Sequence, residues 1–119
     1  MKYQVSERKA FPRPATEVLA AADELVTQLG GKRPRTSAGA GQVQADFNKA
    51  VGGTLFANRV QLVVRVLSDG ADQCTTLVEA YPVDPLGQRL QFGVIGDPAR
   101  LVTRAFWDRL EARLRPVAG

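Results

Sequence analysis

The sequence predicts an α+β fold in which a curved antiparallel sheet of about five strands packs against two helices. Two segments with helical spacing of apolar residues lie near the ends of the 119-residue chain, and segments with strand-like alternation lie between them. Consecutive strands joined by short turns form antiparallel meanders. We therefore expect the order strand, helix, four strands, helix. The length fits one domain, spanning residues 1–119.

The first strand is expected over residues 2–11, where apolar and polar side chains alternate. Prolines directly after it end the strand, since proline cannot donate a hydrogen bond to a neighbouring strand. The first helix is expected over residues 14–29, because its apolar residues recur every three or four positions and form one stripe. Pro14 suits the first helical position, and the pair Gly30-Gly31 suits the end of the helix.

The middle of the chain is predicted to be mainly strands. Residues 32–41 form a loop by composition, and a short strand follows over residues 43–47. The longest strand is expected over residues 55–68 and its hairpin partner over residues 73–83, because an Asp-Gly turn signal separates them. Alternation of apolar residues places a last strand over residues 90–94.

The long strand predicts which sheet face is buried. Its inner face is formed by Val60, Leu62, Val64 and Val66. Its other face mixes apolar with charged and polar residues, namely Arg59, Gln61, Val63, Arg65 and Leu67. The partner strand leaves two alternatives open. Either the inward side chains are Leu77, Tyr81 and Val83, or they are Cys74, Thr76, Val78 and Ala80.

The second helix is expected to begin at Asp97-Pro98, an aspartate cap followed by proline at the first helical position. Its apolar residues repeat every four positions, and Pro116 stops it. Since each amphipathic helix must bury one face, both should pack on the sheet and leave its other face partly open.

The order of elements resembles two known folds. It is similar to the β-α-β4-α unit of the TATA-box-binding-protein-like fold, and it looks like a shortened relative of the helix-grip folds, such as the START and pollen-allergen families. The strand-then-proline entry from Phe11 to Val18 is similar to that of helix-grip proteins, as is the amphipathic helix from Asp97 to Arg115. The resemblance implies a ligand cavity, reduced in size here because the sheet and second helix are short. It rests on topology and on no family motif, so it carries little functional weight.

Composition excludes several kinds of catalysis. The chain has 16 basic and 12 acidic residues, a net charge of +4, no histidine and one cysteine. A Ser-His-Asp or Cys-His site lacks its base, and a cysteine-based zinc site lacks its ligands. We therefore expect neither an enzyme nor a metal or cofactor site. The lone thiol and the absence of an apolar leader favour a cytoplasmic location.

The open sheet face supplies the candidate binding residues Arg59, Arg65, Glu79 and Tyr81. Glu79 is a charge within an apolar strand, and we expect it close to Tyr81 and opposite Arg65. The simpler interpretation is a solvated cross-strand pair. The leading hypothesis is a non-catalytic module that binds an apolar or amphipathic small ligand, or a protein partner. A homodimer would cover the exposed edges of so small a sheet.

The alternative function is nucleic-acid binding. It would use the densest basic run, which contains Lys32, Arg33 and Arg35. No aromatic residue adjoins this run to stack on a base. A solvated loop is therefore the simpler interpretation of these three residues.

Overall fold

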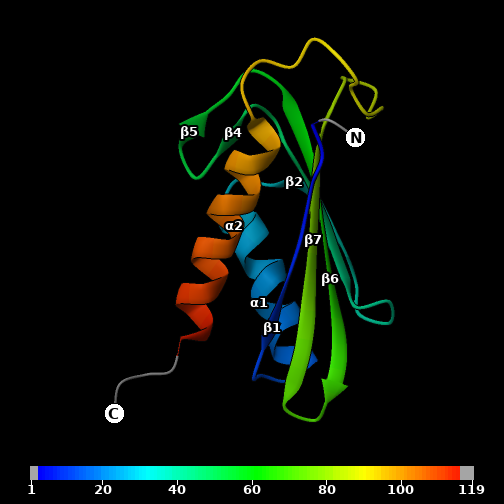
Figure 1. Cartoon of the computed structure of the whole chain (residues 1–119), viewed down its shortest axis with the longest axis vertical. Helices are drawn as coiled ribbons and strands as arrows, with labels where there is room; N and C mark the ends of the chain where they lie inside the picture. Colours follow the sequence, from blue (N-terminus) through cyan, green and yellow to red (C-terminus); the bar gives the residue numbers. More distant parts are fainter. Residues whose placement is uncertain (1–2, 116–119) are drawn as a thin grey trace.

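The structure is a computed structural model that describes residues 3–115, with the backbone alone at Arg33. Five antiparallel strands form its sheet, in the order β1-β7-β6-β3-β2, and both helices pack on one face (Figure 1). The elements are β1 (Val5–Phe11), α1 (Ala15–Gln28), β2 (Lys32–Ser37), β3 (Gln42–Phe47), β6 (Arg59–Gly70), β7 (Gln73–Val83) and α2 (Pro98–Leu114). A separate small hairpin consists of β4 (Ala50–Val51) and β5 (Thr54–Leu55). The sheet does not close, and the predicted α+β order is confirmed.

Both helices form where the spacing of apolar residues predicts them. The first, α1, buries a single stripe made of Val18, Ala21, Ala22, Leu25 and Val26. Gly31 follows it, and a Cβ atom there would meet the Val26 carbonyl oxygen at 2.6 Å, so the close approach requires glycine. At α2, the Asp97 carboxylate accepts the backbone N–H of Arg100 at 3.4 Å and caps the helix. The expected stop at Pro116 and strand start at Lys2 lie outside the described residues.

The core lies between the helices and one face of the sheet. All four side chains predicted for the inner face of the long strand are buried, namely Val60, Leu62, Val64 and Val66. For β7 the structure selects the second alternative, with Cys74, Thr76, Val78 and Ala80 buried against the helices. The helices contribute the other half of this core, which includes Phe106 and Leu110 at 0% exposure.

The predicted loop over residues 32–41 was wrong, because its first part is the edge strand β2. It pairs with β3 through a register that shifts between Lys32 and Arg35. An edge strand tolerates the missing N–H of Pro34, so the loop-like composition does not prevent pairing. The Thr36 hydroxyl also donates to the Asp23 carboxylate of α1 at 2.5 Å, which ties the strand to the helix.

The predicted last strand over residues 90–94 was also wrong. This segment is irregular. It is linked to β7 by the backbone N–H of Leu90, which donates to the Pro82 carbonyl at 2.9 Å, and by an isolated bridge between Val83 and Arg89 just before it. Gly93 has a φ of +78°, which interrupts any extended run. The long strand likewise begins at Arg59 instead of residue 55, since residues 54–55 pair with β4. The strand count is retained because β2 takes the place of the missing strand.

Candidate functional site

The outer face of the sheet is the face that carries no helix. Three cross-strand rows run over it, because outward residues of β3, β6 and β7 stand opposite one another. These rows are Gln42–Arg65–Leu77, Gln44–Val63–Glu79 and Asp46–Gln61–Tyr81. Polar and apolar side chains are mixed on this face, as the sequence predicts. The irregular segment after β7 covers one end of it.

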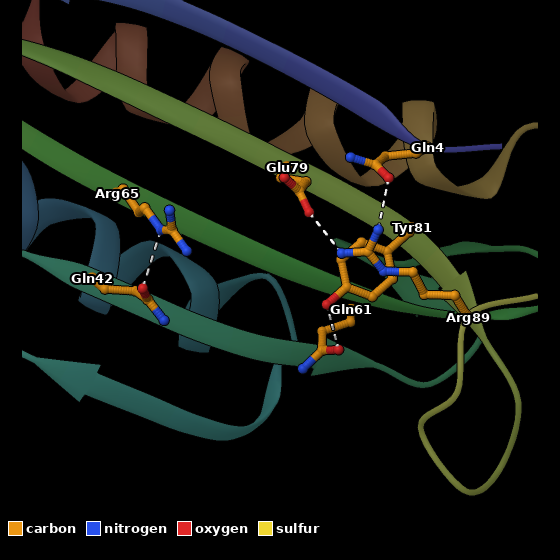
Figure 2. Close-up of polar contacts among 7 residues, drawn as sticks. All are labelled: Gln4, Gln42, Gln61, Arg65, Glu79, Tyr81 and Arg89. Carbon is orange, nitrogen blue, oxygen red and sulfur yellow. Dashed lines mark hydrogen bonds and ion pairs between the residues drawn. The ribbon is translucent and has the colours of Figure 1, made fainter. Parts of the chain in front are cut away.

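The centre of the site is the stack of Arg89 on Tyr81 (Figure 2). The guanidinium donates to Glu79 Oε1 at 3.0 Å and to Gln4 Oε1 at 2.9 Å, so it spans β7 and the chain just before β1. The Tyr81 hydroxyl donates to Gln61 Oε1 at 2.8 Å on the neighbouring strand. Tyr81, Glu79 and Gln4 thus hold the arginine in place, and Gln61 in turn holds the tyrosine.

Arg65 does not belong to this cluster. Its Nε donates to Gln42 Oε1 at 3.2 Å, and its cross-strand neighbour is Leu77 (Figure 2). Glu79 stands opposite Val63, so the expectation that it lies opposite Arg65 was wrong. The register is displaced by one pair of outward residues. The carboxylate instead forms an ion pair with Arg89.

A polar cavity of about 270 Å³ opens on the same face, beside the Tyr81 cluster. Its walls come from four strands, β2, β3, β6 and the end of β7, and from the turn that follows β7. The lining residues are Arg35, Asp46, Arg59, Gln61, Val83, Pro85, Leu86 and Gly87. The turn is ordered because Asp84 Oδ1 accepts the backbone N–H of Leu86 at 2.8 Å and of Gln88 at 2.9 Å. We call this cavity the Arg35–Arg59 pocket.

The Arg35–Arg59 pocket brings together residues that the sequence analysis assigned to two different functions. Arg59 was a candidate for small-ligand binding, whereas Arg35 belonged to the nucleic-acid alternative. Lys32 lies on the same edge strand and pairs in register with Asp46. The Arg33 side chain lies outside the described part of the chain.

Two residues of this surface, Arg89 and Gln61, were missed by sequence reasoning. A signal for Arg89 was present, because residues 84–87 (Asp-Pro-Leu-Gly) have the composition of a turn, and this turn returns the chain toward the end of β7. Gln61 was assigned to the outer face without a role. Its place opposite Tyr81 depends on the hairpin register, which the sequence alone leaves open.

Other concave regions differ in character. The space between the inner sheet face and α2 is filled by buried side chains, among them Val102, Phe106 and Leu110. A groove of about 230 Å³ runs between β1 and α2 and is lined mainly by charged side chains. A shallow cavity of about 320 Å³, near the start of α1, is lined mostly by small and apolar residues, including Ala15, Leu19 and Val66.

Metal ligands and the single thiol are the remaining candidates for chemistry in residues 3–115. No group of three or more metal-ligating side chains comes together there. Burial raises the pKa of the Cys74 thiol, and the Asp69 and Glu17 carboxylates raise that pKa further. The thiol is therefore protonated at neutral pH, which makes it a poor nucleophile. Within the same residues, no helix is long and apolar enough to cross a membrane.

The fold is START-like. No protein-family model and no curated protein matches the chain. Among solved structures, a START superfamily protein from Mycobacterium smegmatis is 13% identical, with 93% of this chain and 96% of that one covered, at a TM-score of 0.51. The resemblance to START-like helix-grip folds is thereby confirmed at the level of fold.

Two further similar structures come from biosynthetic gene sets. The di-domain ARO/CYC protein BexL of the BE-7585A pathway has 10% identity and a TM-score of 0.53. DynU16, from the dynemicin biosynthetic locus, has 19% identity and a TM-score of 0.50. The alignments cover 93% and 94% of this chain but only 43% and 47% of theirs, so this chain spans less than half of either protein.

Proposed function

We propose that this chain is a non-catalytic module that binds a small ligand on the outer face of its sheet. The observation that carries the proposal is the Arg35–Arg59 pocket, a polar cavity of about 270 Å³ whose walls come from four separate segments. At about 270 Å³ the cavity is slightly smaller than the roughly 300 Å³ at which small-molecule sites begin, and it has the few convergent polar groups that such sites use.

The fold supports this class of function. START-like neighbours include a di-domain ARO/CYC protein and a protein of a biosynthetic locus, which associates the fold with small organic molecules. In this chain the inner space beside α2 is filled by its own core. A ligand would therefore bind on the outer surface.

The side chains favour binding over catalysis. The chain contains no histidine, and the Cys74 thiol is buried and protonated at neutral pH. The carboxylate of Glu79 is engaged by Arg89 at 3.0 Å, so it is held in an ion pair instead of facing a substrate as a free base. Cytoplasmic location and homodimerisation stay predictions, and sedimentation velocity tests the latter.

An NMR titration tests the proposed site. ¹⁵N-labelled protein is mixed with a set of neutral and charged small organic compounds, and amide shifts are mapped on the structure. We expect the responsive amides to include Asp46, Gln61 and Val83. The variant Arg59→Ala should weaken the response, whereas the matched exposed variant Arg109→Ala should retain it. Responses confined to the α1 cavity near Leu19, or none at all, would contradict the proposal.

A further inference from the structure

We propose that the Arg35–Arg59 pocket binds the anionic group of its ligand, a single carboxylate or phosphate on a small organic molecule. This inference rests on the proposed function and specifies its ligand class. Arg35 and Arg59 both line the cavity, and neither guanidinium makes a hydrogen bond or ion pair with any described residue.

Other arginines of the molecule show what an engaged guanidinium looks like here. On the same face, Arg89 bonds Glu79 and Gln4, and Arg65 bonds Gln42. On the helix side, Arg113 bonds Glu24 at 2.6 Å. The pocket therefore holds two guanidinia without partners among the described residues, the exposed Arg35 and the half-buried Arg59, and one anion between them would satisfy both.

The backbone arrangement allows both guanidinia to reach one anion. Arg35 lies on β2 and Arg59 begins β6, with β3 between them. Arg35 lies level with Val63, its neighbour across Gln44, and Val63 is four residues along β6 from Arg59. With neighbouring strands about 4.8 Å apart and about 3.3 Å per residue along a strand, the two Cα atoms are separated by roughly 16 Å. Arginine side chains are long enough to approach a shared oxyanion from both sides of such a gap.

Gln61 supplies a third donor. Its Oε1 accepts the Tyr81 hydroxyl hydrogen at 2.8 Å, which leaves the amide nitrogen as the end available for donation. Since Gln61 also lines the cavity, the Arg89–Tyr81 stack indirectly orients a donor toward the ligand. The outer-face cluster and the pocket thus act as one site.

Asp46 restricts the ligand. Its carboxylate lines the same cavity and has an interaction partner of its own. The formal charges of the three charged lining residues, Arg35, Arg59 and Asp46, sum to +1. A single small anionic group, a carboxylate or a phosphate, suits that small positive excess better than a chain of many anions does. A nucleic acid instead needs a row of cations along an open track, which a cavity closed by the turn at Pro85–Gly87 does not offer.

The test titrates ¹⁵N-labelled protein with inorganic phosphate, acetate and neutral acetamide at constant ionic strength. We expect phosphate or acetate to shift the Arg35 and Arg59 Nε signals, and acetamide to leave them unchanged. Arg35→Gln and Arg59→Gln should each weaken anion binding by about tenfold, the loss of one charge-assisted contact. Arg109→Gln, an exposed helix arginine, should bind as the parent does. Circular dichroism confirms that each variant folds.

Several results would overturn the inference. Equal weakening by Arg109→Gln would mean unspecific charge attraction. Binding of neutral compounds in the pocket without any response to anions would refute the anion site and leave the proposed function intact, whereas no binding by either class would refute both. Tight binding of duplex DNA that depends on Arg35 and Arg59 and falls steeply with salt would assign the pocket to nucleic acid instead.

Discussion

The guanidinium carbon of Arg89 lies 3.9 Å from the ring centroid of Tyr81. This contact explains why Tyr81 is only 9% exposed although it projects from the face that no helix covers. The turn that starts at Asp84 returns the chain along β7, so a residue from an irregular segment covers a strand residue (Figure 2). The open face is therefore capped at one end and accessible elsewhere.

Removing that cover should cost a modest amount of stability. Arg89→Ala deletes a cation–π contact worth about 0.5–1 kcal/mol and an ion pair between half-exposed groups worth about 0.2–1 kcal/mol. We expect the free energy of unfolding to fall by roughly 1 kcal/mol in urea titrations. The exposed Arg109→Ala serves as the control. An effect no larger than that of the control would contradict the role given to Arg89.

The filled space beside α2 leads to a second prediction. Phe106 is fully buried between α2 and the sheet, so Phe106→Ala should lower the free energy of unfolding by about 3–5 kcal/mol. Leu101→Ala, on the exposed side of the same helix, should cost much less. Denaturation followed by circular dichroism compares the two. A small loss at Phe106 would show that this space is not tightly packed.

The Cys74 thiol should make stability depend on alkaline pH. Burial raises its pKa above the ordinary value of 9.0, with the Asp69 and Glu17 carboxylates adding to the shift. Above that pH the unfolded thiol ionises while the folded thiol stays protonated, so stability falls as pH rises through the folded pKa. Below pH 9.0 the thiol has no such effect.

Unfolding free energies at pH 7 and pH 10 test this sign. The decline between these pH values should be larger in the parent protein than in Cys74→Ala, where other titrating groups still contribute. Thiol-reactive dye should also modify Cys74 slowly in the native state. An identical decline in both proteins would show that the thiol has the same pKa folded and unfolded.

Periodicity located both helices and the inner face of the long strand. These features depend on patterns repeated over many residues, such as the buried series at Val60, Leu62, Val64 and Val66. Residues 90–94 show the limit of the same reasoning. Their alternation is real, but Gly93 has a positive φ and the segment is too short to enforce pairing. Composition wrongly predicted a loop at β2, because an edge strand that contains a proline has the composition of a loop.

The sequence predicted part of the candidate site, because strand alternation shows which side chains share a sheet face. The sequence placed Arg59, Arg65, Glu79 and Tyr81 on one mixed face, and all four lie on it. Their partners could not be predicted, because a shift of one outward pair decides whether Glu79 faces Arg65 or Val63. Arg35 joined Arg59 only through the pairing of β2 with β3 and of β3 with β6.

The sequence by itself determined the order of elements, the buried side of each helix and the absence of a histidine-based site. Those properties are local, since a period of two or 3.6 and a residue count need no knowledge of distant contacts. Only the tertiary structure decided which residues meet. Strand order brings Arg35 and Arg59 to the same cavity. The turn after β7 folds Arg89 onto Tyr81 (Figure 2). Both arrangements bring together residues from different segments of the chain. They depend on the strand register and on the path of the turns, which are fixed only when the whole core packs.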